Sequence, residues 1–249
     1  MDLRGRSVLI TGGSRGLGAA LGRALARKGA RVVLVARGRA DLEGVVAEIR
    51  ASGGEAHALV ADVSQAEAIP PLVGAAAALV GPIDLLVHNA STLGRLPLRL
   101  LLETEAEELQ RVLETNLVGP FRLTKAVAGS MLLRGRGLVL HISSDAAVVG
   151  YPRWGAYGIS KAALDHLARI AAAELRGTGV RFLAVDPGEM NTRMHADAVP
   201  DEDPGSLRDP ARVAERILAL IEHAESLAEG ARIEVMSWAP HPPLEAAGA

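Results

Sequence analysis

The chain of 249 residues contains no cysteine. That absence excludes disulfide bonds, thiolate metal ligands and a cysteine nucleophile, and it is compatible with a cytosolic protein. Long hydrophobic runs are also missing, because the most apolar tract, residues 72–80, is far shorter than a membrane-spanning helix. The apolar run near the amino terminus, residues 8–10, is too short for the core of a signal peptide. We therefore expect a cytoplasmic protein with no membrane partner.

An excess of positive charge is absent as well, since 27 Lys and Arg stand against 29 Asp and Glu. This balance gives no indication of a nucleic-acid partner. No group of His, Asp and Glu has the spacing of a metal site, so we predict no metal, and we expect His88 and His141 to be hydrogen-bonded core residues. The chain is rich in hydrophobic residues, which make up 49% of it and are enough for a sizeable core.

Short aliphatic runs alternate with longer stretches of helical spacing along the whole chain. The predicted strands are residues 8–10, 31–36, 55–60, 83–88, 137–142, 180–185 and, more weakly, 232–236. The predicted helices are residues 17–27, 42–51, 65–80, 104–131, 156–175 and 210–223. This alternation predicts an α/β fold, a single-domain, Rossmann-type doubly wound parallel sheet of about seven strands with helices on both faces. In such a fold ligands bind at the carboxyl ends of the strands.

A glycine-rich stretch, TGGSRGLG at residues 11–18, follows the first predicted strand and opens the first helix. Three of its glycines, Gly12, Gly16 and Gly18, need a local reason, because glycine costs backbone entropy in any regular element. A glycine turn lets the backbone approach a phosphate closely, and the helix amino terminus offers free N–H groups and a partial positive charge. The alternative is a tight strand-to-helix turn with no ligand.

The spacing T-G-x-x-x-G-x-G resembles the opening motif of the short-chain dehydrogenase/reductase family, and further motifs of that family follow in order over nearly the whole chain. They are Asp62-Val63 after the third strand, His88-Asn89-Ala90-Ser91 in place of Asn-Asn-Ala-Gly, Asn116 in the long helix, Ser144, Tyr157-x-x-x-Lys161, and Pro187-Gly188-x-Met190-x-Thr192 in place of Pro-Gly-x-Val-x-Thr. The substitutions at His88 and Ser91 lie outside the catalytic positions. They therefore bear on cofactor affinity more than on activity.

Tyr157 and Lys161 lie four residues apart and so share one helix face. A cation near the phenol would lower a tyrosine pKa from about 10 toward the working range of a general acid. The family resemblance implies catalytic roles for four residues. Tyr157 would exchange a proton with the substrate oxygen and Ser144 would hydrogen-bond it. Lys161 would lower the pKa of the tyrosine and bind the nicotinamide ribose, and Asn116 would hold a water of the proton relay.

The resemblance also implies a nicotinamide dinucleotide cofactor. The residues expected to bind it are Gly12, Ser14, Arg15, Gly16, Leu17, Gly18, Arg37, Asp62, Val63, Asn89, Ala90, Tyr157, Lys161, Pro187, Gly188, Met190 and Thr192. The place of an acid that would bind the ribose 2′-hydroxyl of NAD is held by Ala36, with Arg37 and Arg39 after it. A guanidinium grips a phosphate with two parallel hydrogen bonds, so this pattern favours NADP(H).

These features together predict an NADP(H)-dependent enzyme that interconverts a small-molecule carbonyl and an alcohol. A non-catalytic NADPH-binding sensor or scaffold, or a dehydratase or epimerase on the same fold, remains an alternative. We expect a dinucleotide-binding and catalytic domain over residues 1–238, a substrate lid over 189–209 and a flexible tail over 239–249. The lid follows from the breaker-rich stretch 186–210, whose acidic residues would repel one another. The family resemblance further implies a homodimer or homotetramer.

Overall fold

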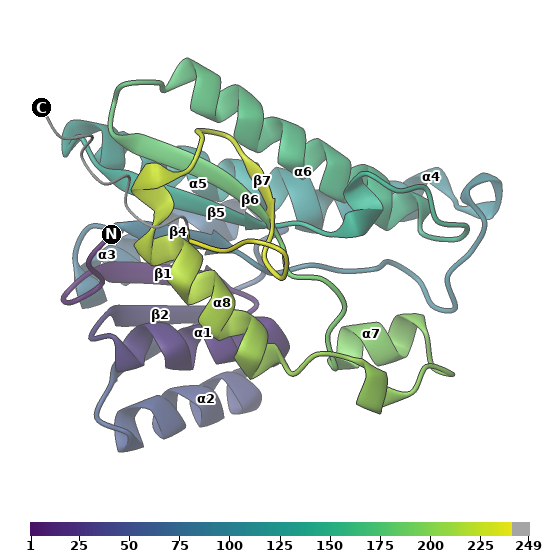
Figure 1. The fold of residues 1–249 in the computed structure, drawn as a ribbon, viewed down its shortest axis with the longest axis horizontal. Helices are drawn as coiled ribbons and strands as arrows, with labels where there is room; N and C mark the ends of the chain where they lie inside the picture. The colour runs from purple at the N-terminus through teal and green to yellow at the C-terminus, as the bar shows by residue number, and fades with distance from the viewer. Residues whose placement is uncertain (241–249) are drawn as a thin grey trace, which may run out of the picture.

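The computed structural model describes residues 1–240 and contains one sheet of seven strands, all parallel (Figure 1). The strands are β1 (Ser7–Thr11), β2 (Arg31–Ala36), β3 (Glu55–Val60), β4 (Leu85–His88), β5 (Gly137–Ile142), β6 (Val180–Asp186) and β7 (Arg232–Glu234), in the spatial order β3-β2-β1-β4-β5-β6-β7. The predicted doubly wound α/β fold is therefore confirmed, with strand ends shifted by one or two residues. The tail predicted over 239–249 lies, beyond residue 240, outside the described residues.

Helices cover both faces of the sheet, as Figure 1 shows. They are α1 (Gly16–Arg27), α2 (Arg39–Ala51), α3 (Ile69–Val80), α4 (Ala106–Leu113), α5 (Gly119–Leu133), α6 (Gly155–Glu174), α7 (Arg193–Ala198) and α8 (Pro210–Glu222). Alternate residues of a strand face opposite sides, so Val8 and Ile10 join the core under α1, α2 and α8, whereas Leu9 joins the core under α3, α5 and α6. No helix within residues 1–240 has both the length and the apolar character needed to cross a membrane.

Three segments depart from the predicted elements. The helix predicted over 104–131 is interrupted by a π-helical turn, Glu114–Val118, which separates α4 from α5. The one predicted over 65–80 begins with a short 3₁₀ turn, Ala66–Ala68, before α3. The breaker-rich stretch 186–210 was expected to be an irregular loop but contains α7, where the Thr192 hydroxyl accepts a hydrogen bond from the His195 N–H and so caps the helix.

The order of the strands reverses between β1 and β4, which are neighbours in the sheet although two strands separate them in sequence. Crossover connections leave the carboxyl ends of β1 and β4 in opposite directions, so a crevice opens between them. The loops after β1, β4, β5 and β6 all leave the same edge of the sheet because the strands are parallel. This edge is where the glycine-rich stretch and the Ser144 segment meet.

Two histidines are buried next to each other in the core beneath this edge. His88 and His141 are register partners on β4 and β5, and their rings stack with centroids 5.0 Å apart. His88 shares a 2.7 Å hydrogen bond with the Thr124 hydroxyl, as expected. Neither ring nitrogen of His141 has a hydrogen-bond partner among residues 1–240, so the expectation of a hydrogen-bonded histidine is wrong at this position.

We predict that these histidines make the fold sensitive to acid. Burial, together with the charge of Lys161, lowers the pKa of His141 from 6.5 to about 3, and burial lowers the pKa of His88 in the same direction. Between these values only the unfolded chain binds the proton, so the stability is complete above pH 6.5 and falls as the pH drops toward 3.

His141→Phe keeps an aromatic ring in the stack and removes one titrating group. The pH dependence of the free energy of unfolding, measured by urea denaturation between pH 6 and 4, should become shallower by about 1.4 kcal/mol per pH unit. His223→Phe, at an exposed position, is the control. An unchanged slope in His141→Phe would show that the buried ring already carries a proton.

Candidate active site

The glycine-rich turn after β1 can be built only with glycine at two of its positions. Gly12 has a φ of +69°, and a Cβ there would lie 2.7 Å from the Asn89 side-chain nitrogen. A Cβ on Gly18 would lie 2.2 Å from the Gly12 carbonyl oxygen. A larger residue at Gly12 would push the loop away from the segment after β4, and one at Gly18 would push the loop away from the start of α1. These two glycines therefore allow the loop to pack closely against the helix α1 and against the end of the neighbouring strand β4.

The amino terminus of α1 is free to bind an anion. No side chain in the described part of the chain caps this helix, and its first turn contains no acidic residue. Gly16 and Leu17, at its start, line the large cavity at the sheet edge together with Ser14 and Arg15 of the preceding turn. Unpaired backbone N–H groups and the helix dipole both favour a phosphate at this point.

Asn89 fastens the turn to the end of β4. Its side-chain nitrogen donates to the carbonyl oxygens of Thr11 at 2.9 Å and Gly12 at 3.1 Å. In return, the Thr11 hydroxyl accepts hydrogen bonds from the backbone N–H groups of Asn89 and Ala90. These four bonds tie the ends of the two strands that flank the crevice. The side-chain amide of Asn89 thus stabilises the conformation of the glycine-rich loop.

The end of the cavity next to β2 is lined by two arginines, Arg37 and Arg15, and by two aspartates, Asp41 and Asp62. Arg37 follows Ala36 and lines the cavity with a side chain that is 77% exposed, and its nearest acid, Asp62, is 3.9 Å away. Arg15 lines the same cavity. Arg39 does not line the cavity and pairs instead with Glu43, one turn further along α2.

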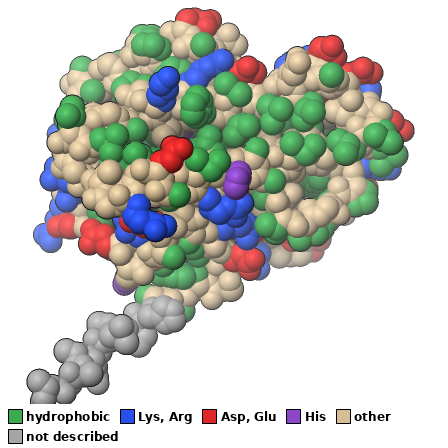
Figure 2. All heavy atoms as spheres, turned by 90° about the horizontal axis from the view of Figure 1, so that it is seen from above, with side chains coloured by type: hydrophobic (Ala, Val, Ile, Leu, Met, Phe, Trp, Pro, Cys, Tyr) green, Lys and Arg blue, Asp and Glu red, His purple; other side chains and the backbone are tan. Residues whose placement is uncertain are grey.

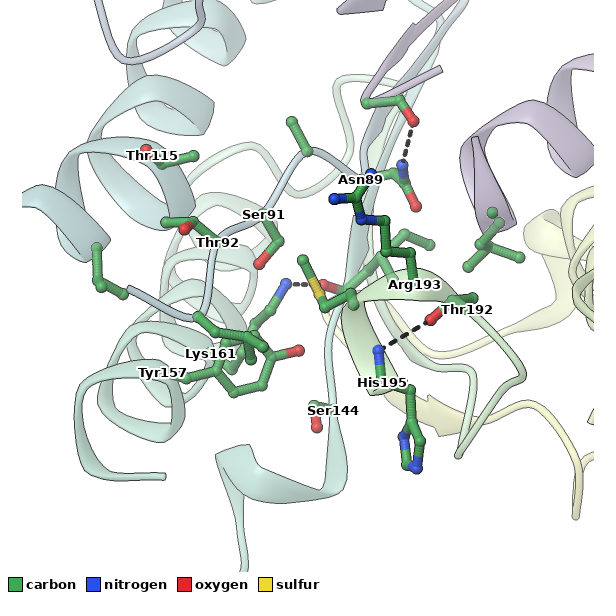
Figure 3. Close-up of a pocket in the computed structure, with 18 of the residues that line it drawn as sticks. Asn89, Ser91, Thr92, Thr115, Ser144, Tyr157, Lys161, Thr192, Arg193 and His195 are labelled. Carbon is green, nitrogen blue, oxygen red and sulfur yellow. Dashed lines mark hydrogen bonds between the residues drawn. The ribbon is translucent and has the colours of Figure 1, made fainter. Parts of the chain in front are cut away.

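Ser144, Tyr157 and Lys161 meet at the centre of the cavity (Figure 3). Ser144 follows β5, where its hydroxyl donates to the Asp145 carboxylate at 2.9 Å and accepts from the Ala146 N–H. Tyr157 and Lys161 lie on the first turns of α6, and the Tyr157 hydroxyl points into the cavity. The Lys161 ammonium donates to the carbonyl oxygen of Ile142 at 2.7 Å and lies 5.4 Å from the centre of the Tyr157 ring.

Burial dominates the electrostatics of this group. It raises the pKa of the Tyr157 phenol, an effect that hydrogen bonding to Ser144 opposes and the charges of Asp186 and Asp145 increase. It also lowers the pKa of Lys161 to about 8, which the charge of Asp165 partly offsets. The sequence predicts that Lys161 lowers the tyrosine pKa. The net shift is upward because burial dominates, and the Lys161 ammonium is turned toward the carbonyl oxygen of Ile142.

Asn116 lies in the π-helical turn, fully buried behind the cavity wall. Its side-chain nitrogen donates to the Thr92 carbonyl and to the Ser160 hydroxyl, both at 2.9 Å, and its side-chain oxygen accepts from the Thr92 N–H at 2.8 Å. The π turn rotates Asn116 inward, as such turns often do at functional sites. Asn116 thereby links the loop after β4 to α6.

The segment after β6 closes the remaining side of the cavity. Met190, Thr192 and the start of α7 line it, and Met194 packs with Leu93, Trp154 and the Tyr157 ring. Met190 pairs with Arg208 in an isolated parallel bridge, which joins the two ends of the segment. One of its acids, Glu202, pairs with His195 at 2.7 Å. Another acid, Asp197, lies 3.9 Å from the guanidinium of Arg193, which partly compensates the expected mutual repulsion of the acids.

All these elements enclose a single cavity of about 1780 Å³. The predicted site residues that line it are Gly12, Ser14, Arg15, Gly16, Leu17, Arg37, Asp62, Val63, Asn89, Ala90, Ser144, Tyr157, Lys161, Pro187, Gly188, Met190 and Thr192. Gly18 and Asn116 support the wall from behind. The sequence reasoning missed Asp145, Tyr151, Arg193, His195 and Glu202, which also line it. Asp145 could have been found from its place beside Ser144, whereas the others follow from no motif. Residues 1–240 hold no group of three or more metal-ligating side chains.

The chain matches known proteins along most of its length. A family model described as short chain dehydrogenase matches residues 6–203. A short chain dehydrogenase of Pseudocercospora fijiensis is 39% identical over 78% of this chain, and the match spans 63% of that relative's length. A 3-oxoacyl-[acyl-carrier-protein] reductase of Synechocystis is 38% identical over 77% of each protein.

Solved structures agree with this match. The crystal structure of a short chain dehydrogenase of Shigella flexneri, complexed with NADP, has a TM-score of 0.87 and 28% identity, covering 94% of this chain and 99% of that one. Sequence motifs, the fold and the arrangement of the cavity all point the same way. The chain belongs to the short-chain dehydrogenase/reductase family of oxidoreductases.

Proposed function

We propose that the protein is an NADP(H)-dependent oxidoreductase that interconverts a carbonyl compound and an alcohol, with Tyr157 as the proton donor and acceptor. The observation that carries the proposal is the meeting of Ser144, Tyr157 and Lys161 in one cavity with the uncapped amino terminus of α1. When bound, the nicotinamide supplies the hydride, and the protein supplies binding, orientation and the proton.

The residues of the cavity fit a dinucleotide. The N–H groups at the start of α1 would bind its phosphates, and Asp62 and Val63 would lie along the adenosine end. The turn of Pro187 and Gly188, with Thr192, would hold the nicotinamide end. Two observations support this assignment. The cavity is large, and Gly12 and Gly18 contact their neighbours so closely that the loop packs tightly against α1 and the end of β4 and leaves the crevice open.

The position of Tyr157 suits a proton donor, because its hydroxyl points into the cavity, where the oxygen of a carbonyl being reduced would lie. Burial raises the pKa of the phenol and so opposes release of its proton, which means that donation depends on stabilising the phenolate that is left. The hydroxyl of Ser144 would orient that oxygen from the other side. A protonated Lys161 near the ring would stabilise the phenolate left behind, because opposite charges attract strongly in a buried site.

The charges at the end of β2 favour NADP(H) over NAD(H). An acid that would bind a ribose 2′-hydroxyl is replaced by Ala36, while the guanidinium groups of Arg37 and Arg15 border the cavity. Arg37 is held only by a long contact to Asp62 and is therefore available to a 2′-phosphate.

A homo-oligomer fits the distribution of exposed side chains. Hydrophobic side chains gather on the face that Figure 2 shows, the side of the molecule on which α6 lies. The exposed large hydrophobic residues of α5 and α6 are Phe121, Leu132, Leu133, Ile159 and Ile170. Apolar side chains that gather on one face are typical of protein interfaces. We therefore propose that the oligomer forms through α5 and α6.

The first prediction concerns Tyr157→Phe, which removes only the hydroxyl. Carbonyl-dependent NADPH oxidation should fall by about 10² to 10⁴ in kcat, while the affinity for NADPH stays close to that of the parent. Tyr151→Phe is a matched control, because Tyr151 is the only other tyrosine and borders the same cavity. Parent-like turnover in Tyr157→Phe would remove Tyr157 as the donor. Product formation without net NADPH consumption would favour the dehydratase or epimerase alternative.

The second prediction concerns cofactor choice. Ala36→Asp combined with Arg37→Ala should shift the ratio of kcat/KM from NADP(H) toward NAD(H), because the carboxylate repels the 2′-phosphate and accepts from the 2′-hydroxyl. Arg39→Ala, whose side chain pairs with Glu43 outside the cavity, should leave the ratio unchanged. A parent enzyme that already prefers NAD(H) would contradict the assignment.

The third prediction is that residues 189–209 form a lid that cofactor orders. Met194 and Ala198 pack against the side chains around Tyr157, so a bound nicotinamide would add contacts to the same segment. Amide hydrogen exchange with and without NADPH should show protection gained within 189–209 and unchanged exchange in α2. Equal protection of the segment in both states would mean that it is a permanently ordered loop.

A further inference from the structure

Arg232 reaches from the last strand of the sheet into the base of the candidate active site. It begins β7, and its side chain is only 13% exposed. One terminal nitrogen, Nη2, donates to the carbonyl oxygen of Ser144 at 3.0 Å and to the carboxylate of Asp186 at 2.7 Å. A single guanidinium thus holds the backbone of Ser144 and the end of β6.

Asp186 extends this hold to the cofactor side of the cavity. Its second carboxylate oxygen accepts a hydrogen bond from the Gly188 N–H at 2.9 Å. Gly188 has a φ of +70° and belongs to the turn that leads into the lid segment. The orientation of that turn therefore depends on Asp186, and the orientation of Asp186 depends on Arg232.

A third contact connects Arg232 to α6. Its Nε lies 3.2 Å from the carboxylate of Asp165, whose side chain is 3% exposed. Asp165 follows Lys161 by four residues and therefore lies one turn further along the same face of the helix. The guanidinium is in this way shared by three segments that carry Ser144, Lys161 and Gly188, and these segments come together only in the folded chain.

The charges in this cluster make the arginine hard to replace. Asp165 and Asp186 are both buried, and a buried carboxylate without a partner is costly. Arg232 also pairs with the exposed Glu234 at 3.4 Å, which adds little. A planar guanidinium can meet several acceptors in fixed directions, whereas a lysine ammonium acts as a flexible point charge. Lysine would therefore keep the charge balance and lose the geometry.

We propose that Arg232 is a positioning residue, which holds the Ser144 backbone and the turn from Asp186 to Gly188 in the arrangement that hydride and proton transfer require. This role rests on the proposed oxidoreductase function. Arg232 does not line the cavity, so it acts through the three segments it joins. Misplacement of a reacting group by a fraction of an ångström lowers a rate with little effect on binding.

Arg181 offers a matched comparison. It lies near the start of β6, its side chain is 19% exposed, and it bonds to the Leu227 carbonyl and pairs with Glu229. It therefore contributes a half-buried arginine and an ion pair to the same part of the sheet, at the strand end opposite to the cavity. A purely structural role for Arg232 would give the two arginines similar effects on substitution.

The test compares Arg232→Lys with Arg181→Lys in the full chain, with melting temperature, kcat and KM as readouts. We expect a loss of melting temperature in both variants, but a fall in kcat of about tenfold or more in Arg232→Lys alone, with the KM for the carbonyl substrate nearly unchanged. Asp186→Asn keeps an acceptor for the Gly188 N–H and should lower kcat in the same direction. Parent-like kcat in Arg232→Lys would overturn the proposal, as would an equal loss of kcat in Arg181→Lys. If Arg232→Lys does not fold, amide exchange in Asp186→Asn decides: exchange of residues 186–190 at the parent rate would overturn the proposal.

Amide hydrogen exchange gives a second readout that needs no turnover. Residues 143–146 and 186–190 should exchange faster in Arg232→Lys than in the parent, and at the parent rate in Arg181→Lys. Unchanged exchange in Arg232→Lys would overturn the proposed hold. If the parent turns over no carbonyl compound, the proposed function fails, while this measurement still decides the role of Arg232.

Discussion

The parallel direction of all seven strands is the constraint on which the rest of the structure depends. Because every strand ends at the same edge, segments that are far apart in sequence come together there. They are the glycine turn after β1, the Asn89 loop after β4, the Ser144 segment after β5 and the turn after β6. The reversal of strand order between β1 and β4 then opens a crevice at this edge. The helices bury both faces of the sheet, so the chemistry is confined to its rim.

Burial also sets the electrostatics beneath that rim. Lys161, Asp165, Asp186 and Arg232 are two cations and two anions in a largely water-free layer, and each lies on a different turn or strand. Such a balanced group is stable only when all of its members are present, because a lone buried charge has no compensation. The same desolvation raises the pKa of Tyr157, so the phenol stays protonated. It also lowers the pKa of Lys161 to about 8.

Much of the fold and of the candidate site could be predicted from the chain alone, since local patterns carried the information. Aliphatic runs gave the strands, and the motifs gave Gly12, Ser144, Tyr157 and Lys161, all of which line one cavity. The π-helical turn at Asn116 could not be predicted, because its sequence continues a helical pattern and only contacts to residues 92 and 160 favour the wider turn. The direction of the tyrosine pKa was wrong for a related reason: spacing along a helix says nothing about solvent.

By itself the sequence determined the alternation of strands and helices, the glycine positions and the identity of the reactive groups, because these depend on neighbours within a few residues. Only the tertiary structure decided which groups are desolvated and which distant side chains meet. Arg232, 88 residues beyond Ser144, belongs to no motif, yet its guanidinium bonds to the Ser144 carbonyl. That contact exists because β6 pairs with β7 on one side and with β5 on the other, and a pairing between strands is decided by the packed core rather than by any local stretch of the chain.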